Sequence, residues 1–278
     1  MTPAASSVKF AVWGQPIAHT LSPRIHEAAF RARGLAYGYA AWEVAPDGVG
    51  EACRRARAEL RGVNVTRPLK QVVMSCLDGV TEEAGLLGAV NVLFFREGRL
   101  LGANTDGKGF LDALGEDPRG MRVLILGSGG AARAVGQALV GAGARVTVAA
   151  RRPQSVEWSL PPGQVLPWEQ RNRPGGPYDG VVQATPLGQH PGPAVNPFEA
   201  FATIVPGGFA MDLVYRPRLT PFLAAAAQAG LRTVDGVWML AYQAARSWGY
   251  WLGEDGPAEV MRQAALAALE EPAGMKSP

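Results

Sequence analysis

The sequence predicts an α/β protein built on a doubly wound, mostly parallel sheet. Apolar runs of strand length alternate with amphipathic stretches of helix length along most of the chain. The segment 121–152 contains a strand, a glycine-rich turn, a helix and a second strand in that order. Strands that alternate with helices in this way are typical of a parallel sheet with helices on both faces.

The composition is that of a globular protein, and it excludes several kinds of site. The chain has 278 residues, enough for one large domain or two ordinary ones, and 47% of them are hydrophobic. Two cysteines exclude a disulfide framework and a cysteine-based zinc cluster, and three histidines leave little material for a histidine-rich metal site. We therefore assign no metal.

Charge and hydropathy indicate which partners to expect. The formal net charge of +3 is scattered along the chain and forms no basic stripe, which argues against nucleic-acid binding. No apolar run approaches the roughly 18 residues of a membrane span. The first residues, MTPAASSVKF, do not resemble a secretory signal. We expect a cytoplasmic protein with no membrane partner.

Helix and strand signals divide the chain into short elements. Residues 8–14 predict a strand, and Ser22 followed by Pro23 predicts a helix with Ser22 as its N-cap and Gly34 as its stop. Glu97 and Gly98 predict the turn of a hairpin within 90–107. The remaining patterns predict strands over 37–44, 62–65, 178–185 and 208–215, helices over 51–60 and 68–77, loops over 153–177 and a helical region from 237.

The string GSGGAA at 127–132 fits the dinucleotide-binding pattern G-x-G-x-x-A. It follows an apolar strand and precedes a helix, which is the context that the motif requires. Gly127 permits the tight turn, Gly129 lets the backbone approach a pyrophosphate, and Ala132 allows close packing of the helix on the strand. The free N–H groups at the start of the helix suit phosphate oxygens. A glycine-rich turn without a ligand is the alternative.

The second strand of this unit indicates which dinucleotide binds. An NAD site needs Asp or Glu about 20 residues after the glycines to bind the ribose 2′-hydroxyl. No acidic residue occurs between Asp117 and Glu157, and the strand ends in Arg151 and Arg152. Guanidinium groups match a 2′-phosphate in charge and geometry. The sequence therefore predicts NADP, with a solvated arginine pair as the alternative.

Seven strings in a fixed order resemble the shikimate dehydrogenase family. They are GQPIAHTLSPRIH at 14–26, GVNVTRPLK at 62–70, GAVN at 88–91, NTDG at 104–107, GSGGAAR at 127–133, YRPRLTPFL at 215–223 and DGVWMLAYQA at 235–244. The resemblance covers about residues 9–250. It implies reversible, NADPH-dependent reduction of 3-dehydroshikimate to shikimate, a step of aromatic amino-acid biosynthesis.

The resemblance also implies a split architecture. Residues 1–103 and 237–278 would form an α/β substrate-binding domain completed by the last helices. Residues 104–236 would form a Rossmann domain that binds NADP. A homodimer is left open, because the sequence does not give the oligomeric state.

The site residues follow from the matching strings. Thr20 and Ser22 lie at a strand-to-helix turn, where hydroxyl and N–H groups can hold the substrate carboxylate. Amide, hydroxyl and phenol groups that suit the ring hydroxyls are those of Asn64, Thr66, Asn91, Tyr215 and Gln243. An N-cap role for Ser22 and turn chemistry for the asparagines are the alternatives. The cofactor residues are Gly127, Ser128, Gly129, Gly130, Ala131, Ala150, Arg151, Arg152, Leu213 and Gly236.

Lys70 and Asp106 match the paired lysine and aspartate of the family. Reduction of a ketone places a hydride on carbon and a proton on oxygen. An ammonium group beside the carbonyl can donate that proton, and the amine can take it back in the reverse reaction. A carboxylate can orient the ammonium and bind the substrate. A surface salt bridge is the alternative for Lys70, although lysine is rare in this chain.

Several positions depart from the family pattern. Thr20 stands where serine is usual, which puts the distinction from quinate in doubt, and Val92 stands where threonine is usual. The usual Asn-Arg-Thr is replaced by Ala150-Arg151-Arg152, and the usual Asn-Ala-Thr-Ser by residues 183–186, QATP. The competing hypotheses are a quinate or dual-specificity dehydrogenase and a noncatalytic nucleotide sensor on the same fold. The arginine pair disfavours the first, and the presence of Lys70 and Asp106 disfavours the second.

Overall fold

The computed structural model describes residues 7–156, 164–173 and 175–271. The chain divides into two compact units, and each contains one sheet. The first unit ends at Thr105 and resumes at Gln243, and the second comprises Asp106–Tyr242. Both divisions fall slightly further along the chain than the boundaries that the sequence predicts.

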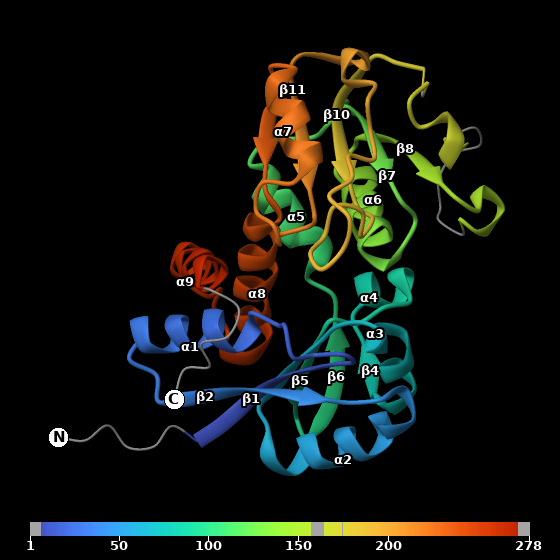
Figure 1. Ribbon diagram of the computed structural model, residues 1–278. Coiled ribbons are helices and arrows are strands. Elements are labelled where there is room, and N and C mark those ends of the chain that lie inside the picture. The colour runs from blue at the N-terminus through green and yellow to red at the C-terminus, as the bar shows by residue number, and fades with distance from the viewer. Residues whose placement is uncertain (1–6, 157–163, 174, 272–278) are drawn as a thin grey trace. The chain divides into compact units, whose positions relative to one another are not determined.

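The first unit contains a mixed sheet in the order β2-β1-β3-β5-β6-β4 (Figure 1). Strand β1 runs parallel to both of its neighbours, β4 runs parallel to β6, and β5 runs antiparallel to β3 and β6. The strand bounds are β1 Ser7–Gly14, β2 Tyr37–Glu43, β3 Gly62–Val65, β4 Gly79–Val80, β5 Val92–Arg96 and β6 Arg99–Ala103.

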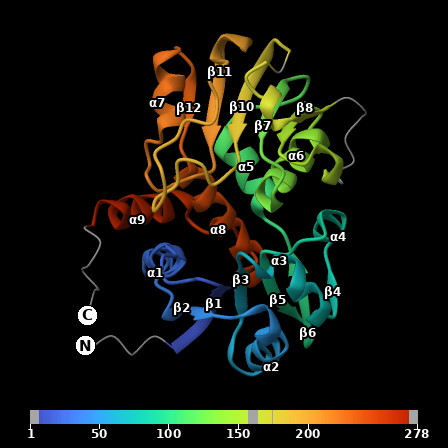
Figure 2. The same cartoon turned by 45° about the vertical axis from the view of Figure 1, so that its right-hand side comes forward.

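Helices cover both faces of this sheet (Figures 1 and 2). Because side chains alternate along a strand, Ala11 and Trp13 of β1 join the apolar cluster with α2, whereas Phe10 faces the other way. Phe10 packs on Phe30 of α1, with ring centroids 5.2 Å apart, and on Trp251 of α8 at 4.9 Å. The helix bounds are α1 Ser22–Ala32, α2 Val49–Glu59, α3 Leu69–Val72, α4 Glu82–Leu87, α8 Gly236–Leu252 and α9 Ala258–Glu270.

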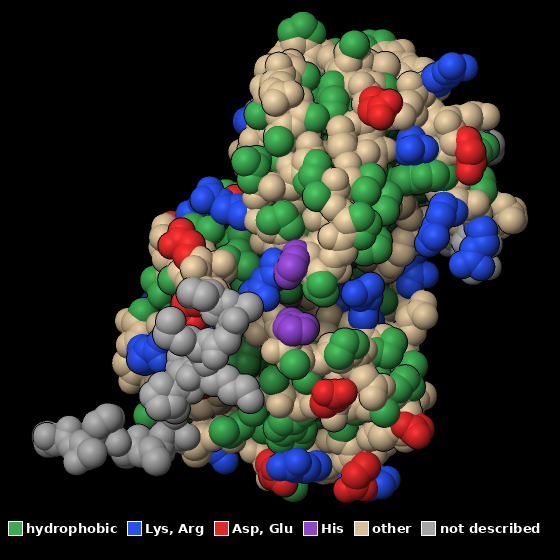
Figure 3. Space-filling view, viewed as in Figure 1, with side chains coloured by type: hydrophobic (Ala, Val, Ile, Leu, Met, Phe, Trp, Pro, Cys, Tyr) green, Lys and Arg blue, Asp and Glu red, His purple; other side chains and the backbone are tan. Residues whose placement is uncertain are grey.

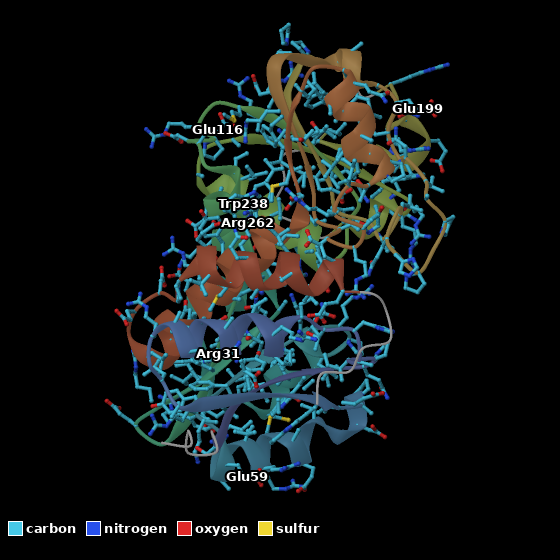
Figure 4. All side chains as sticks on the ribbon, turned by 60° about the vertical axis from the view of Figure 1, so that its left-hand side comes forward. Arg31, Glu59, Glu116, Glu199, Trp238 and Arg262 are labelled. Carbon is cyan, nitrogen blue, oxygen red and sulfur yellow. The ribbon has the colours of Figure 1, made fainter. Side chains whose placement is uncertain are left out.

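The outer side of α2 carries ion pairs that lie in solvent. Arg55 pairs with Glu59 at 2.9 Å, and Arg54 pairs with Glu51. Figure 3 shows acidic and basic side chains next to one another over this lower rim, and Figure 4 labels Glu59 there. Exposed pairs of this kind contribute only about 0.3–0.5 kcal/mol each. The apolar side of α2 therefore anchors the helix.

The structure confirms several predicted elements of the first unit and corrects one. The strand over 62–65 and the hairpin with Glu97 and Gly98 at its turn are present, and both turn residues have positive φ. The predicted helix over 68–77 is shorter: α3 covers four residues and a 3₁₀ segment, Val73–Cys76, follows it.

The predicted capping role of Ser22 is wrong. Helix α1 begins at Ser22 itself, and the N-cap position belongs to Leu21, whose backbone is already helical at φ −91° and ψ −6°. Leu21 has no side-chain cap to offer, and the N–H of Ser22 donates to Thr20 Oγ1 at 3.3 Å. The Ser22 hydroxyl instead accepts a hydrogen bond from Thr20 Oγ1 at 3.2 Å.

The second unit confirms the doubly wound parallel sheet. Its strand order is β12-β11-β10-β7-β8-β9, and every neighbouring pair is parallel. Helices α5 and α6 pack on one face and α7 on the other. The bounds are α5 Asp106–Leu114, β7 Arg122–Leu126, α6 Gly130–Gly141, β8 Arg145–Ala150, β9 Val165–Pro167, β10 Tyr178–Gln183, β11 Ile204–Asp212, α7 Pro221–Gln228 and β12 Arg232–Val234.

Edge strand β9 was not predicted, because 153–177 has the proline and glycine content of loops. The strand is only three residues long and pairs with Val148, Ala149 and Ala150 of β8. Such a short strand carries no periodic signal in sequence, and its pairing with β8 is the only feature that defines it. Among the described residues, no helix is long and apolar enough to cross a membrane.

We predict that Gly62→Ala destabilises the first unit. A Cβ at this position would overlap the Trp251 indole, which is held in place by a hydrogen bond from Nε1 to Leu93 O at 2.9 Å. Overpacking of a rigid neighbour costs about 1–3 kcal/mol of the unfolding free energy. Urea denaturation measures this loss.

Gly50→Ala provides the matched control. Gly50 lies within α2, and a Cβ there would meet nothing within 4 Å. Alanine in a helix is favoured over glycine by roughly 0.5–1 kcal/mol, so this variant should be slightly more stable. Equal stability of the two variants would contradict the close packing of Trp251 on Gly62.

Candidate functional site

The predicted site residues fall into two sets, one in each unit. The first unit contains Thr20, Ser22, Asn64, Thr66, Lys70, Asn91 and Gln243, and the second contains Asp106, Tyr215 and the ten cofactor candidates. Most members of each set lie at or just after strand ends, and Gln243 lies within α8.

Asn64 and Asn91 lie where three strands of the first unit meet. The N–H of Val65 donates to Asn91 O at 2.8 Å, and the N–H of Asn91 donates to Ala103 O at 3.0 Å. Asn64 is therefore held beside Asn91, and the end of β6 beside both. The two residues are 6% and 2% exposed, so their amide groups need partners inside the protein.

Gln243 joins this group from α8. The Asn91 Nδ2 donates to Gln243 Oε1 at 3.4 Å. Thr105 Oγ1 donates to Gln243 O at 2.9 Å, and the N–H of Thr105 donates to Asn91 Oδ1 at 2.8 Å. The structure thus gathers Asn64, Asn91 and Gln243, which are far apart in sequence, into one polar cluster.

Thr20 and Ser22 have their hydroxyls side by side at the start of α1. Thr66 and Lys70 lie on the segment that follows β3. The N–H of Thr66 donates to Trp13 O at 2.8 Å, which fixes this turn beside the end of β1. Lys70 is half-buried on α3, and its carbonyl accepts from the N–H of Val90 at 2.7 Å. Its backbone therefore lies beside the segment that carries Asn91.

Sequence reasoning missed several polar residues of the first unit. Thr105, Tyr39 and Ser247 are buried and bond directly to the predicted asparagines. Thr105 had one signal, since it lies inside the string NTDG next to Asp106. Tyr39 and Ser247 had none, because a tyrosine in a strand or a serine in a helix is ordinary.

The glycine-rich turn of the second unit has the geometry that its sequence predicts. Gly127 has φ +112°, and a Cβ there would lie 2.9 Å from Thr185 Cγ2. Ser128, Gly129 and Gly130 are exposed, and a Cβ at Gly129 or Gly130 would meet nothing within 4 Å. Helix α6 begins at Gly130, so its free N–H groups face open space that an anion can enter.

Ala150, Arg151 and Arg152 lie at the same edge of the sheet as this turn. Leu126 of β7 is paired in register with Ala149 of β8, and the N–H of Gly127 donates to Ala149 O at 2.9 Å. Both arginines are exposed. The structure therefore places two guanidinium groups after the strand next to the turn, an arrangement that suits a phosphorylated dinucleotide.

The remaining predicted residues of the second unit lie on other segments. Leu213 and Gly236 are in contact, because a Cβ at Gly236 would lie 2.8 Å from Leu213 O. Asp106 is the first residue of α5 and is 6% exposed. Tyr215 is half-buried on the segment after β11.

The side chain of Gln183 forms hydrogen bonds with the loop that follows it. Its Nε2 donates to Thr185 O at 3.0 Å and to Leu187 O at 2.9 Å. Its Oε1 accepts from the N–H of Thr185 at 2.7 Å and from the Thr185 hydroxyl at 2.8 Å. The buried amide therefore folds the loop 183–187, which follows β10 at the same edge as the glycine-rich turn.

Asp212 is a buried acid that the sequence did not single out. Its Oδ2 accepts from Thr220 Oγ1 at 2.6 Å and its Oδ1 accepts from the N–H of Val214 at 2.9 Å. Burial raises its pKa to about 7, although both hydrogen bonds oppose the shift. Asp212 thus ties the segment after β11, including Leu213, to the N-cap of α7.

Comparison with known proteins shows similarity over both units. A family model described as "Shikimate dehydrogenase substrate binding domain" matches residues 12–93, and one described as "Shikimate 5'-dehydrogenase C-terminal domain" matches residues 236–266. A curated protein of Symbiobacterium thermophilum, named Shikimate dehydrogenase (NADP(+)), is 43% identical over an alignment that covers 93% of this chain and 94% of that protein. These matches confirm the resemblance seen in the sequence.

Solved structures are also similar to this chain over most of its length. Shikimate 5-dehydrogenase from Thermus thermophilus, in complex with NADP(H) and shikimate, has a TM-score of 0.81 and 38% identity, and the match covers 94% of this chain and 100% of that one. The ligand-free 5-ketofructose reductase of Gluconobacter sp. strain CHM43 has a TM-score of 0.85 and 32% identity, with 94% and 99% covered. The fold therefore occurs in enzymes named for different substrates.

We predict that Asp212 makes stability fall as the pH rises. Its pKa is about 7 in the folded state, above the ordinary value of 3.8, so the folded state binds more protons between these two values. The unfolding free energy therefore decreases as the pH rises from about 4 to about 7 and loses no more from this group above that range. In Asp212→Asn, melting temperature should decline less between pH 5 and pH 8 than in the unmodified protein.

Asp47→Asn is the control, because Asp47 is exposed and its substitution should leave the pH dependence unchanged. Identical slopes for the unmodified protein and Asp212→Asn would contradict the raised pKa.

Proposed function

The chain belongs to the shikimate dehydrogenase family, and we propose that it catalyses the reversible, NADPH-dependent reduction of 3-dehydroshikimate to shikimate. This reaction is a step of aromatic amino-acid biosynthesis. The observation that carries the proposal is the hydrogen-bonded cluster of buried Asn64 and Asn91 with half-buried Gln243, in a chain that is similar along its length to enzymes of that name.

In this proposal the first unit binds the substrate. Thr20 and Ser22 hold the carboxylate, since their hydroxyls lie together at the start of α1. Amide and hydroxyl groups of this unit hold ring hydroxyls; they belong to Asn64, Thr66, Asn91 and Gln243. The phenol of Tyr215, in the second unit, is the remaining candidate for a ring hydroxyl. A ring with several hydroxyls needs groups that both donate and accept, which amides and hydroxyls do.

The second unit fits NADP. The open turn Gly127–Ala131 and the start of α6 suit the pyrophosphate, and Arg151 and Arg152, next to Ala150, suit the 2′-phosphate. Leu213 and Gly236, which touch one another, would complete the cofactor contacts. When bound, NADPH supplies the hydride that reduces the carbonyl carbon.

Lys70 acts as the acid and base of the reaction, paired with Asp106. Its ammonium group donates a proton to the carbonyl oxygen during reduction, and its amine accepts the proton during oxidation. Asp106 orients the ammonium and hydrogen-bonds a substrate hydroxyl.

Assays with other substrates distinguish the proposed activity from its alternatives. A quinate or dual-specificity dehydrogenase is disfavoured because Arg151 and Arg152 suit NADP. A nucleotide sensor without activity is disfavoured by the retention of Lys70 and Asp106. The structural similarity to a 5-ketofructose reductase makes that ketone a necessary comparison. We further propose that the protein acts in the cytoplasm and that its partners are small molecules alone. Its mass in solution tests whether it forms a homodimer.

The function is tested by absorbance at the nicotinamide band. Purified protein is incubated with shikimate or quinate and either NADP⁺ or NAD⁺, and separately with 5-ketofructose and NADPH. Turnover should be highest with shikimate and NADP⁺. Absence of turnover with shikimate and either cofactor would reject the proposal, and a preference for quinate or 5-ketofructose would replace its substrate.

We predict that replacing Arg151 and Arg152 with glutamine weakens NADP⁺ much more than NAD⁺. Each lost hydrogen bond to a charged group is worth roughly 1.5–3 kcal/mol, so affinity for NADP⁺ should fall at least about tenfold. Calorimetric titration measures both affinities. Arg145→Gln, at the other end of β8, is the control and should change neither. Unchanged NADP⁺ affinity in the double variant would place the 2′-phosphate elsewhere.

We predict that Lys70→Ala lowers kcat by roughly 10²–10⁴, the usual contribution of a positioned acid–base group. NADP⁺ affinity should hardly change, because the proposed cofactor residues lie in the second unit. Steady-state kinetics and a titration with NADP⁺ measure the two effects. The fold should persist, because Lys70 is only half-buried.

Asp106→Asn should also be slow. The variant with both changes should be far less impaired than the product of the single effects, because groups that act as a unit are not additive. A raised KM with an unchanged kcat in Lys70→Ala would show that Lys70 only binds the substrate.

A further inference from the structure

A buried chain of hydrogen bonds orients Asn64, one of the residues that are proposed to hold the substrate. The Tyr39 hydroxyl donates to Asn64 Oδ1 at 2.7 Å. The Asn64 amide donates in turn to Ser247 Oγ at 2.9 Å and to Asn91 O at 3.4 Å. Tyr39, Asn64 and Ser247 are 4%, 6% and 0% exposed, so water does not compete for these bonds. The orientation of the Asn64 amide is therefore fixed before any ligand binds.

The phenol of Tyr39 stays protonated. Burial raises the pKa of Tyr39 well above its usual value, because the charged form would lose its hydration. The Tyr39 hydroxyl therefore keeps the proton that it donates to Asn64 Oδ1.

His26 holds the ring of Tyr39 in place. The two rings stack with centroids 4.4 Å apart and an interplanar angle of 3°. His26 Nδ1 accepts from Trp248 Nε1 at 3.0 Å. Burial lowers the pKa of His26 to about 3, so the imidazole is uncharged at neutral pH. A neutral, fully buried ring is a rigid support for the phenol and no candidate for proton transfer.

We propose that Tyr39 is a positioning residue that holds the Asn64 amide in a fixed orientation. A ring hydroxyl of the substrate then meets an amide that is already oriented. Groups that are already ordered lose less conformational freedom on binding, which improves affinity. The inference rests on the proposed function, because that function assigns Asn64 to a ring hydroxyl.

Tyr39→Phe tests this role, because it removes one oxygen and keeps the ring that stacks on His26. The KM for shikimate should rise roughly 3- to 10-fold, the effect of one lost hydrogen bond. The kcat and the KM for NADP⁺ should stay within about twofold. A merely structural role would lower the amount of active enzyme, and therefore the apparent kcat, while leaving the KM for shikimate unchanged.

Tyr37→Phe is the matched control on the same strand. The Tyr37 hydroxyl accepts from Arg61 Nη1 at 2.8 Å in an exposed setting and touches neither Ser22 nor Asn64. All kinetic constants of this variant should equal those of the unmodified enzyme. A rise in its KM equal to that of Tyr39→Phe would overturn the proposal.

The remaining outcomes also decide the matter. An unchanged KM for shikimate in folded Tyr39→Phe would overturn the positioning role and leave the proposed function intact. If thermal melting shows that this variant does not fold, Ser247→Ala replaces it, since it removes the other side-chain partner of Asn64; the same rise in KM is expected, and its absence overturns the role. An unmodified protein that does not turn over shikimate would overturn the proposed function and this inference with it.

Discussion

The need to pair buried amide groups determines the arrangement of the first unit. Asn64 and Asn91 lie at strand ends that are closed to water, and an unpaired amide there would cost about 1–3 kcal/mol. Their partners come from β2, from the segment after β6 and from α8. The hydrogen bonds that satisfy these amides thereby gather residues 39, 64, 91, 105, 243 and 247 around one point. The same bonds that stabilise the fold orient the proposed substrate-binding groups.

The second unit meets a different constraint, because its proposed ligand is an anion. Parallel strands place their carboxyl ends at one edge, and the turn at Gly127–Gly130, the arginines after β8 and the loop of Gln183 all follow such ends. Gly127 must be glycine, since its φ is positive and the backbone of Ala184 lies against it. Gly129 and Gly130 have open space around them, which leaves room for a ligand rather than for packing.

Asp212 is a buried acidic group of the second unit. It is buried, and its pKa is raised because the charged form loses hydration, yet it holds the backbone of Val214 and the side chain of Thr220. These contacts fix the segment after β11, which touches Gly236 at the start of α8. A group that is unfavourable as a charge is thus tolerated where it orders a segment near the proposed cofactor contacts.

Local sequence was sufficient wherever the determining interactions are local. The hairpin turn at Glu97 and Gly98 needs positive φ, the strand–turn–helix unit at 121–152 has its own periodicity, and both were predicted. Strand β9 and the partners of Asn64 were not, because each depends on residues distant in the chain. The start of α1 was predicted one residue too far along the chain. Leu21 is already helical, so Ser22 has no cap to form, and Tyr39 reaches Asn64 only because β2, β1 and β3 lie side by side in one sheet. The sequence by itself thus determined the class of fold, the family and the types of residue at the site, whereas the pairing of strands decided which polar groups meet, since burial makes each of them depend on a partner that only the folded chain supplies.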